Sequence, residues 1–339
     1  MKKIVVDAMG SDSAPLPEVK GGVLAVQDID DLFITFIGNE KLIRSELELL
    51  STTTSCKMDI SNRIEVINAT ETITMHDDPI VALKTKTDSS MTKGILLLKE
   101  GNAEAYISAG NTGATMTIAT ILLGCIEGVT RPTIGVFVPT SSNKNIFLLD
   151  VGATLECRSR YLYEYAVMGS TFYRTFFGVP SPLIGMLNIG EEPTKGTKEL
   201  IEANKKLSNS GLNFFGNIEG GDILSGKTDV VICDGYVGNI ILKFMEQFHL
   251  LFNCVLDNVV ASNTQYTTQT DFISDLKLAF SKLYNPENYG GVPLVGINGN
   301  VIIGHGKSTP IAIKNMIMQA ISCIDSKINE QIAEELAKN

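Results

Sequence analysis

Residues 105–114, Ala-Tyr-Ile-Ser-Ala-Gly-Asn-Thr-Gly-Ala, guide the interpretation of the whole chain. The stretch begins as an apolar strand and leads into a short turn with two glycines, and a helical run follows from Thr115 to Cys125. Backbone N–H groups in such a turn can point at an anion, whose charge the helix dipole favours. The stretch therefore predicts a phosphate-binding turn. The alternative is a glycine turn that only lets the strand and the helix pack closely.

The composition indicates a globular protein that does not bind nucleic acid. Its 339 residues, 44% of them hydrophobic, are enough for a substantial core in one large domain or two. A net charge of −10 repels nucleic acid, so an anion would need a local basic pocket. The six cysteines are far apart and include no C-x-x-C pair, which argues against a zinc site and against a redox motif. Without a signal peptide or a bilayer-spanning run, we expect a cytoplasmic protein.

Alternating strands and helices predict an α/β fold with a mostly parallel, doubly wound sheet. The pattern begins with a strand over 4–7, a helix through Val26 and a second strand over 32–37. Ligands of such sheets lie beyond the carboxyl ends of the strands, where Asp7 and Asp12 occur. Both could instead be a helix cap or a turn former. An antiparallel hairpin over 134–149 is expected to interrupt the parallel pattern.

Polar, glycine-containing loops follow one predicted strand after another. They include the loops after the strands expected at 145–149, 183–187, 212–215 and 229–233. Lys195 lies in one of them, among other polar groups. Six such strand ends are difficult to explain by turn formation alone, although each single loop is unremarkable. We therefore expect a polar crevice at one edge of the sheet.

Residues 243–284 differ in character and predict a protruding helical hairpin. One apolar helical stripe contains Phe248 and Phe252, a polar turn covers 262–270, and a second stripe begins at Phe272. The two apolar faces suit a homodimer contact, core packing or a membrane surface. Acidic residues slightly outnumber lysines in this segment, so a membrane contact would depend on apolar insertion.

Signatures of several common enzyme classes are missing. The chain has no G-x-G-x-x-G, G-x-S-x-G or H-E-x-x-H motif. The loop at 304–308 resembles the end of a P-loop, but Val301 stands where that motif requires its first glycine. Hydride transfer, serine acylation, zinc hydrolysis and nucleotide hydrolysis all lose support, and no cofactor is expected. A glycine-lined crevice suits phosphate and an acyl carbonyl. Phosphate is already anionic, so attack on that carbonyl needs orientation and oxyanion stabilisation rather than a covalent nucleophile.

Six segments in order resemble one enzyme family over almost the whole chain. They are residues 7–15, 107–114, 150–153, 188–196, 234–239 and 289–291. Together they resemble the PlsX family of phosphate acyltransferases. The resemblance implies transfer of a fatty acyl group from acyl carrier protein to inorganic phosphate, giving acyl phosphate for phospholipid synthesis. It also implies a Rossmann-like three-layer α/β/α sandwich with a protruding helical hairpin.

The resemblance further implies partners and a single acyltransferase domain over 1–339, into which 243–284 is inserted. A homodimer, a peripheral membrane contact and a downstream glycerol-3-phosphate acyltransferase are expected, without cofactor or metal. The alternative enzyme is a phosphotransacetylase-like transferase that uses short acyl-coenzyme A. The non-enzymatic alternative is a membrane-bound scaffold built around residues 243–284.

Site residues follow from the matching motifs. Lys195 is expected to be the cation that steadies phosphate or the developing oxyanion, and Asn239 the amide that orients the thioester carbonyl. The remaining substrate-binding and phosphate-binding residues implied are Asp7, Gly10, Asp12, Gly110, Asn111, Thr112, Gly113, Asp234 and Gly238. The three aspartates either order the loops around the substrate or include a base that takes a proton from phosphate.

Four positions depart from the family pattern. Ser11 replaces a glycine, Lys84 and Gly221 replace arginines, and Thr154 replaces an asparagine. Lysine lacks the bidentate fork of arginine, so contacts with an anion or with the carrier protein at positions 84 and 221 are in doubt.

Overall fold

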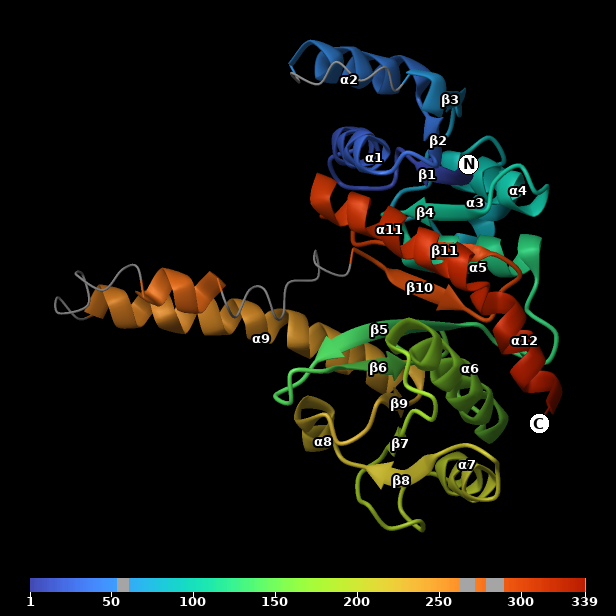
Figure 1. Cartoon of the computed structure of the whole chain (residues 1–339), viewed down its shortest axis with the longest axis vertical. Helices are drawn as coiled ribbons and strands as arrows, with labels where there is room; N and C mark the ends of the chain where they lie inside the picture. Colours follow the sequence, from blue (N-terminus) through green and yellow to red (C-terminus); the bar gives the residue numbers. More distant parts are fainter. Residues whose placement is uncertain (54–60, 263–271, 279–289, 339) are drawn as a thin grey trace. The chain divides into compact units, whose positions relative to one another are not determined.

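A computed structural model describes residues 1–53, 61–262, 272–278 and 290–338 (Figure 1). The chain divides into two compact units. Unit 1 comprises Met1–Gly135, Ser170–Pro180 and Glu287–Asn339, and unit 2 comprises Val136–Gly169 and Ser181–Pro286. The single domain expected over 1–339 stays a prediction.

The sheet of unit 1 is parallel in its larger part. Its strands are β1 (Lys2–Asp7), β2 (Leu32–Gly38), β3 (Ile64–Asn68), β4 (Ala105–Ser108), β10 (Val292–Val295), β11 (Asn300–Ile303) and the start of β5 (Thr133–Pro139). Their order is β3-β2-β1-β4-β11-β10-β5. The first five run parallel, whereas β10 is antiparallel to both of its neighbours. The predicted mixed α/β sheet is confirmed here.

Helices of unit 1 cover both faces of this sheet. They are α1 (Leu16–Asp28), α2 (Glu40–Thr53), α3 (Pro79–Thr85), α4 (Ser90–Lys99), α5 (Thr112–Leu123), α11 (Pro310–Ser326) and α12 (Ile328–Lys338), with a short 3-10 helix η1 (Ser61–Arg63). α1 packs against α2 and α11, and α5 packs against α3 and α4. A Cβ at Gly21 of α1 would lie 2.6 Å from the Cβ of Ile313 in α11, so glycine permits this close approach.

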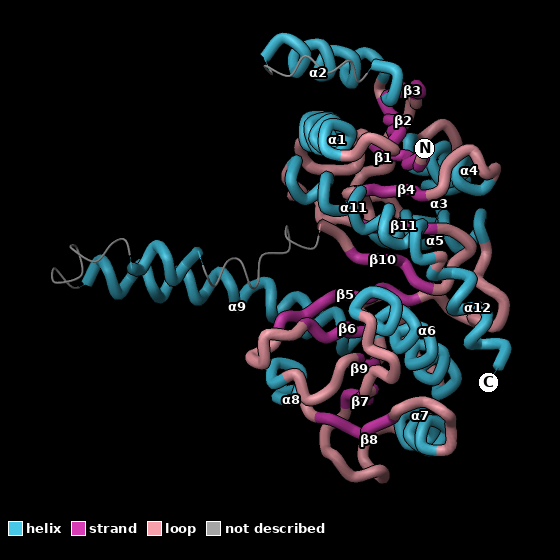
Figure 2. Tube along the Cα trace, in the orientation of Figure 1, coloured by secondary structure: helices cyan, strands magenta, loops and turns pink. Residues whose placement is uncertain are grey.

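Unit 2 has its own parallel strands. They are β6 (Asn145–Leu149), β7 (Ile184–Leu187), β8 (Phe214–Ile218) and β9 (Val230–Ile232), which with the end of β5 have the order β5-β6-β9-β7-β8. β9 runs parallel to β6 and β7, and β7 runs parallel to β8. The helices are α7 (Lys198–Ser208), α8 (Gly220–Ser225), α9 (Gly235–Ser262) and the first part of α6 (Ser159–Phe177), which from Ser170 onward belongs to unit 1. Figure 2 shows these helices and strands by type.

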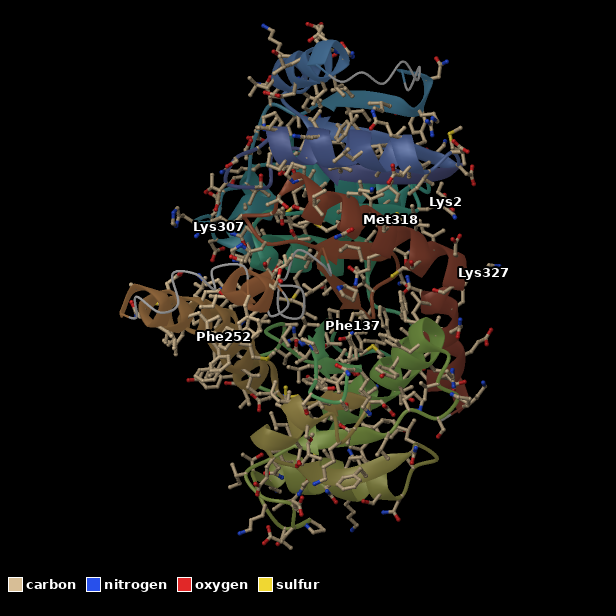
Figure 3. All side chains as sticks on the ribbon, turned by 60° about the vertical axis from the view of Figure 1, so that its left-hand side comes forward. Lys2, Phe137, Phe252, Lys307, Met318 and Lys327 are labelled. Atoms are coloured by element: carbon tan, nitrogen blue, oxygen red, sulfur yellow. The ribbon has the colours of Figure 1, made fainter. Side chains whose placement is uncertain are left out.

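α9 supplies the first arm of the predicted helical hairpin. It is 28 residues long, and Phe252 is among the side chains that it carries (Figure 3). Residues 272–278 are also helical. The predicted turn at 262–270 lies, apart from Ser262, outside the described residues, as do residues 279–284. The hairpin therefore stays a prediction beyond its helical parts.

One predicted element is longer in the structure than expected, and the C-terminal part of the chain adds three elements beyond those predicted above. The strand expected at 212–215 is β8, which runs to Ile218, so Gly216 and Asn217 belong to a strand and not to a loop. Residues 292–295 form β10 although Pro293 interrupts the apolar run, because β5 and β11 pair with it on either side. The chain closes with two helices, α11 and α12, since Lys327 has a φ of 50°, a left-handed conformation that ends α11.

Candidate functional site

Each unit contains one cluster of the predicted site residues. The β1 cluster in unit 1 surrounds Asp7 and the turn after β4, and the β6 cluster in unit 2 surrounds the turn after β6 and the start of α9. The loop at 188–196, which contains Lys195, also belongs to unit 2. Each group lies at the carboxyl ends of parallel strands, where ligands of α/β sheets bind.

Asp7 is the buried centre of the β1 cluster. Its side chain is 2% exposed and accepts hydrogen bonds from the Ser108 hydroxyl at 2.7 Å and the Met9 backbone N–H at 3.1 Å. Burial raises the pKa of this carboxyl, and the hydrogen bonds oppose that effect. A carboxylate enclosed in this way is suited to ordering the two turns around it.

The loop after β1 packs directly on the predicted phosphate-binding turn. A Cβ at Gly10 would lie 2.8 Å from the backbone nitrogen of Gly110, so a side chain at position 10 would displace that turn. The Asp12 N–H donates to the Gly306 carbonyl at 2.8 Å, while its side chain is exposed. Ser11, where the family has glycine, does not have a positive φ and so needs no glycine.

Asn111 caps α5. Its Oδ1 accepts from the Ala114 N–H at 3.0 Å, and its Nδ2 donates to the carbonyls of Thr74 at 3.1 Å and Asp77 at 3.2 Å. The Gly110 N–H donates to the Ser108 hydroxyl at 3.1 Å. Thr112 and Gly113 begin the helix, where backbone N–H groups have no partner within it. These two groups are therefore the donors that the turn can offer to an anion.

Glu18, which no sequence pattern singled out, is part of the β1 cluster. It lies in the first turn of α1, is 0% exposed, and accepts from the Ser11 N–H at 2.9 Å. Burial raises its pKa to about 7, and the charge of Asp7 contributes in the same direction. An acidic residue in the first turn of a helix usually indicates an exposed partner of the helix dipole, so the sequence carried no signal of its burial.

The β6 cluster is centred on Asp150. This side chain is 0% exposed, and its carboxylate accepts from the N–H groups of Gly152 at 3.1 Å, Ala153 at 2.9 Å and Thr154 at 2.7 Å. The start of α9 packs on the same turn, since a Cβ at Gly238 would lie only 1.8 Å from the Asp150 carbonyl oxygen. The motifs at 150–153 and 234–239, far apart in sequence, thus form one structure.

Asp234 and Asn239 both connect α9 to its surroundings. Asp234 precedes the helix, and its Oδ1 accepts from the Val237 N–H at 2.9 Å, which is the geometry of a helix cap. Asn239 Nδ2 donates to the Val151 carbonyl at 3.1 Å. Asn239 is exposed, and its amide has a second hydrogen besides the one donated to Val151.

Lys195 is an exposed cation on a firmly held loop. Its backbone carbonyl accepts from Asn188 Nδ2 at 3.0 Å, and its N–H donates to the Glu192 carbonyl at 3.0 Å. Within the part of the chain that the structure describes, no acidic side chain lies within ion-pair distance of its ammonium group. Lys227 binds Glu191 at 2.5 Å and thereby ties the same loop to the start of α8.

Other lysines near the predicted turns differ from one another. Lys86 is paired with Asp77 at 2.6 Å and donates to the Thr72 carbonyl, which indicates a structural role. Lys84 is exposed on α3. Gly221 faces open space, so the arginine usual at this position would fit there. Lys307, in the loop that imitates a P-loop, is exposed at the surface (Figure 3).

Neither a metal-type cluster nor a membrane-spanning helix is present among the described residues. Outside the gaps at 54–60, 263–271 and 279–289, no three His, Cys, Asp or Glu side chains are grouped as a metal site. No helix in the same residues is long and apolar enough to cross a bilayer.

A mostly parallel sheet whose strands end in glycine turns, with an exposed lysine on one of the loops that follow the strands, is typical of α/β enzymes that handle an anionic group. Comparison with known proteins agrees. The family described as "Fatty acid synthesis protein" matches residues 2–331. Phosphate acyltransferase from Acetivibrio thermocellus is 38% identical over 98% of this chain and 96% of its own. That from Wolinella succinogenes is 38% identical over 100% and 99%.

The chain belongs to this family of phosphate acyltransferases, as the resemblance to the PlsX family predicted, and it is an acyltransferase. Among solved structures, a phosphotransacetylase from Streptococcus pyogenes has a TM-score of 0.59 at 16% identity, with 96% of this chain and 94% of that chain covered. At that identity the likeness shows a shared α/β fold.

Proposed function

We propose that the protein transfers a fatty acyl group from acyl carrier protein to inorganic phosphate. A phosphate oxygen attacks the thioester carbon, the carbon–sulfur bond breaks, and the carrier thiolate leaves and takes up a proton. The products are acyl phosphate and free carrier. One observation carries the proposal beyond family membership: Lys195 is an exposed cation without an acidic partner among the described residues, on a loop whose backbone is fixed.

The proposed roles follow from the geometry of each cluster. Lys195 stabilises the oxyanion that forms on the acyl carbon or the phosphate that attacks it, and Asn239 orients the thioester carbonyl. In unit 1, the first-turn N–H groups of Thr112 and Gly113 bind phosphate. Gly10 lets the loop after β1 pack closely on their turn without displacing it. Asp7 and Asp234 order the turns, because each carboxylate accepts backbone hydrogen bonds.

We further propose a cytoplasmic homodimer that touches the membrane peripherally through α9. Phe244 and Leu251 of this helix are 69% and 58% exposed, which is unusual for large apolar side chains so close together. Acyl phosphate is a reactive mixed anhydride, so a glycerol-3-phosphate acyltransferase at that membrane is the expected consumer of the product.

Turnover with defined substrates tests the proposal. Purified protein is mixed with long-chain acyl carrier protein and labelled phosphate, and labelled acyl phosphate is expected together with free carrier. Lys195→Ala is expected to lower kcat/KM by about 10²- to 10⁴-fold, the loss typical of an oxyanion or positioning contact. Lys198→Ala, a control that removes an exposed lysine three residues away, keeps near-normal turnover.

Two results would contradict this assignment. Preference for a short acyl-coenzyme A over the long-chain carrier substrate would indicate a phosphotransacetylase-like enzyme. Near-normal turnover of Lys195→Ala would remove Lys195 from the mechanism. If that variant also worked normally in cells while replacement of Phe248 and Phe252 abolished function, the scaffold alternative would be favoured.

A further inference from the structure

Two buried asparagines next to the 188–196 loop have no role in the chemistry proposed above. Asn217, on β8, is 2% exposed, and Asn204, on α7, is 5% exposed. A buried amide destabilises a protein unless its donors and acceptors find partners. The hydrogen-bond partners of Asn217 and Asn204 therefore indicate what these two buried amides do.

The two amides form a directed chain. Asn204 Nδ2 donates to Asn217 Oδ1 at 2.9 Å, so the oxygen of Asn217 faces α7 and its nitrogen faces the opposite way. Asn217 Nδ2 donates to the Glu192 carbonyl at 2.7 Å. That carbonyl also accepts from the Lys195 N–H at 3.0 Å, so both of its lone pairs are used. Asn217 thus fixes the group that holds the Lys195 backbone nitrogen.

A third amide holds the other side of Lys195. Asn188, at the end of β7, is 9% exposed, and its Nδ2 donates to the Lys195 carbonyl at 3.0 Å. Gly196 follows with a φ of 90°, and a Cβ there would lie 2.6 Å from Asn188 Oδ1. Asn188 therefore holds the Lys195 carbonyl directly, and Asn217 holds the Lys195 N–H indirectly through the Glu192 carbonyl, while the Lys195 side chain is exposed.

We infer that Asn217, oriented by Asn204, is a positioning residue that sets the place of the Lys195 ammonium group in the reaction. This inference rests on the role proposed above for Lys195. A cation stabilises a transition state most when it is held in place before charge develops, and a loss of about 1 Å in placement is costly. The buried chain provides that fixation, and the exposed lysine side chain alone does not.

The test replaces the amide without changing its shape. Asn217→Asp cannot donate to the Glu192 carbonyl and places a negative oxygen against it, so we expect kcat to fall about 10- to 100-fold. The KM for the acyl carrier substrate should change less than kcat, because a displaced Lys195 ammonium group weakens mainly the stabilisation of the transition state. Asn213→Asp is the matched control. Asn213 is exposed, donates to the Ser181 carbonyl at 3.0 Å, and directly precedes β8.

A second variant preserves the test if Asn217→Asp unfolds. In Asn204→Asp, a carboxylate oxygen faces Asn217 Oδ1 in place of the amide nitrogen that donated to it. The Asn217 amide should therefore turn its nitrogen toward position 204. The donor to the Glu192 carbonyl is then lost while residue 217 stays intact, and kcat should again fall. Circular dichroism and the melting temperature verify that each variant is folded.

A double variant of Asn217→Asp with Lys195→Ala distinguishes failure of this inference from failure of the role proposed for Lys195. If Asn217 acts through Lys195, Asn217→Asp adds little to the loss already caused by Lys195→Ala. Fully multiplicative losses, or folded Asn217→Asp and Asn204→Asp variants with normal kcat, would overturn the inference. A fully active Lys195→Ala variant would instead contradict the role proposed for Lys195, on which the inference depends.

Discussion

At the scale of single residues, Glu18 makes stability depend on pH. Its carboxyl is 0% exposed, and burial raises its pKa from 4.5 to about 7. Between those two values the unfolded chain loses the proton while the folded protein keeps it, so the free energy of unfolding decreases as pH rises. The shift corresponds to a loss of about 3 kcal/mol above pH 7 and to no loss below pH 4.5.

Glu18→Gln removes this titration and keeps the shape of the side chain. Urea unfolding of both proteins at about pH 5 and pH 8 measures the difference. The wild type is expected to lose about 2 to 3 kcal/mol more stability than the variant between these conditions. The raised pKa of Asp7 acts in the same direction in both proteins, so its direct contribution largely cancels in the comparison. Equal pH dependence of the two proteins would contradict the assignment.

Which site residues the sequence could predict depends on where they lie. Asp7 ends β1, Asp234 closely follows β9, and Lys195 lies in the loop after β7. Strand ends of this kind can be located from the apolar pattern. Glu18 and Asn217 could not be selected in this way. Their importance depends on the partner that burial gives them, Ser11 for Glu18 and Asn204 for Asn217, and these partners are set by tertiary packing.

At the scale of elements, the junction of α9 with the turn at 150–154 depends on glycine. A Cβ at Gly238 would lie 1.8 Å from the Asp150 carbonyl oxygen, which is backbone and cannot rotate away. Gly238→Ala must therefore move the start of α9 off the turn. We expect a loss of about 3 kcal/mol in unfolding free energy, together with a fall in activity, because Asn239 moves with the helix.

Gly221→Ala is the control for this prediction. A Cβ at position 221 meets nothing within 4 Å, and alanine is favoured over glycine in α8. Its melting temperature should stay unchanged or rise slightly. A Gly238→Ala protein as stable and active as the wild type would show that α9 can leave this turn without consequence.

Elements that the sequence missed or ended too early are those defined by their neighbours in the sheet. β10 contains Pro293, which weakens any strand prediction, yet it is paired on both sides. The strand at 214–218 contains Gly216, which indicates a turn when only local sequence is considered. Long alternating segments such as residues 2–38 were predicted well, because there the local preference and the tertiary structure agree.

At the scale of the whole molecule, the exposed apolar face of α9 has to be reconciled with a chain of net charge −10. Phe244, Phe248, Leu251 and Val255 are between 46% and 69% exposed and lie on one side of the helix. The lysines nearby are paired, Lys243 with Glu246 at 2.9 Å and Lys277 with Asp257. Anionic lipid would therefore attract this segment only weakly, and binding should depend on apolar insertion.

Vesicle flotation tests that expectation. We expect the full chain to float with vesicles of phosphatidylcholine and with equimolar phosphatidylcholine and phosphatidylglycerol to a similar extent, with little effect of salt. Phe248→Ser combined with Leu251→Ser should reduce the bound fraction at least about tenfold, because each apolar side chain contributes about 1.5–3 kcal/mol when buried. Ile121→Ser with Leu155→Ser, which alters two exposed apolar residues elsewhere, should bind like the wild type.

Sedimentation velocity on the same variants separates the two partners proposed for this face. If α9 inserts into lipid, the double variant at 248 and 251 keeps the mass of the wild type in solution and loses only flotation. If the face joins two copies of the chain, the same substitutions lower the mass from dimer to monomer. Unchanged flotation and unchanged mass would show that these side chains serve neither contact, since burial of two large apolar groups cannot be lost without a measurable change in association.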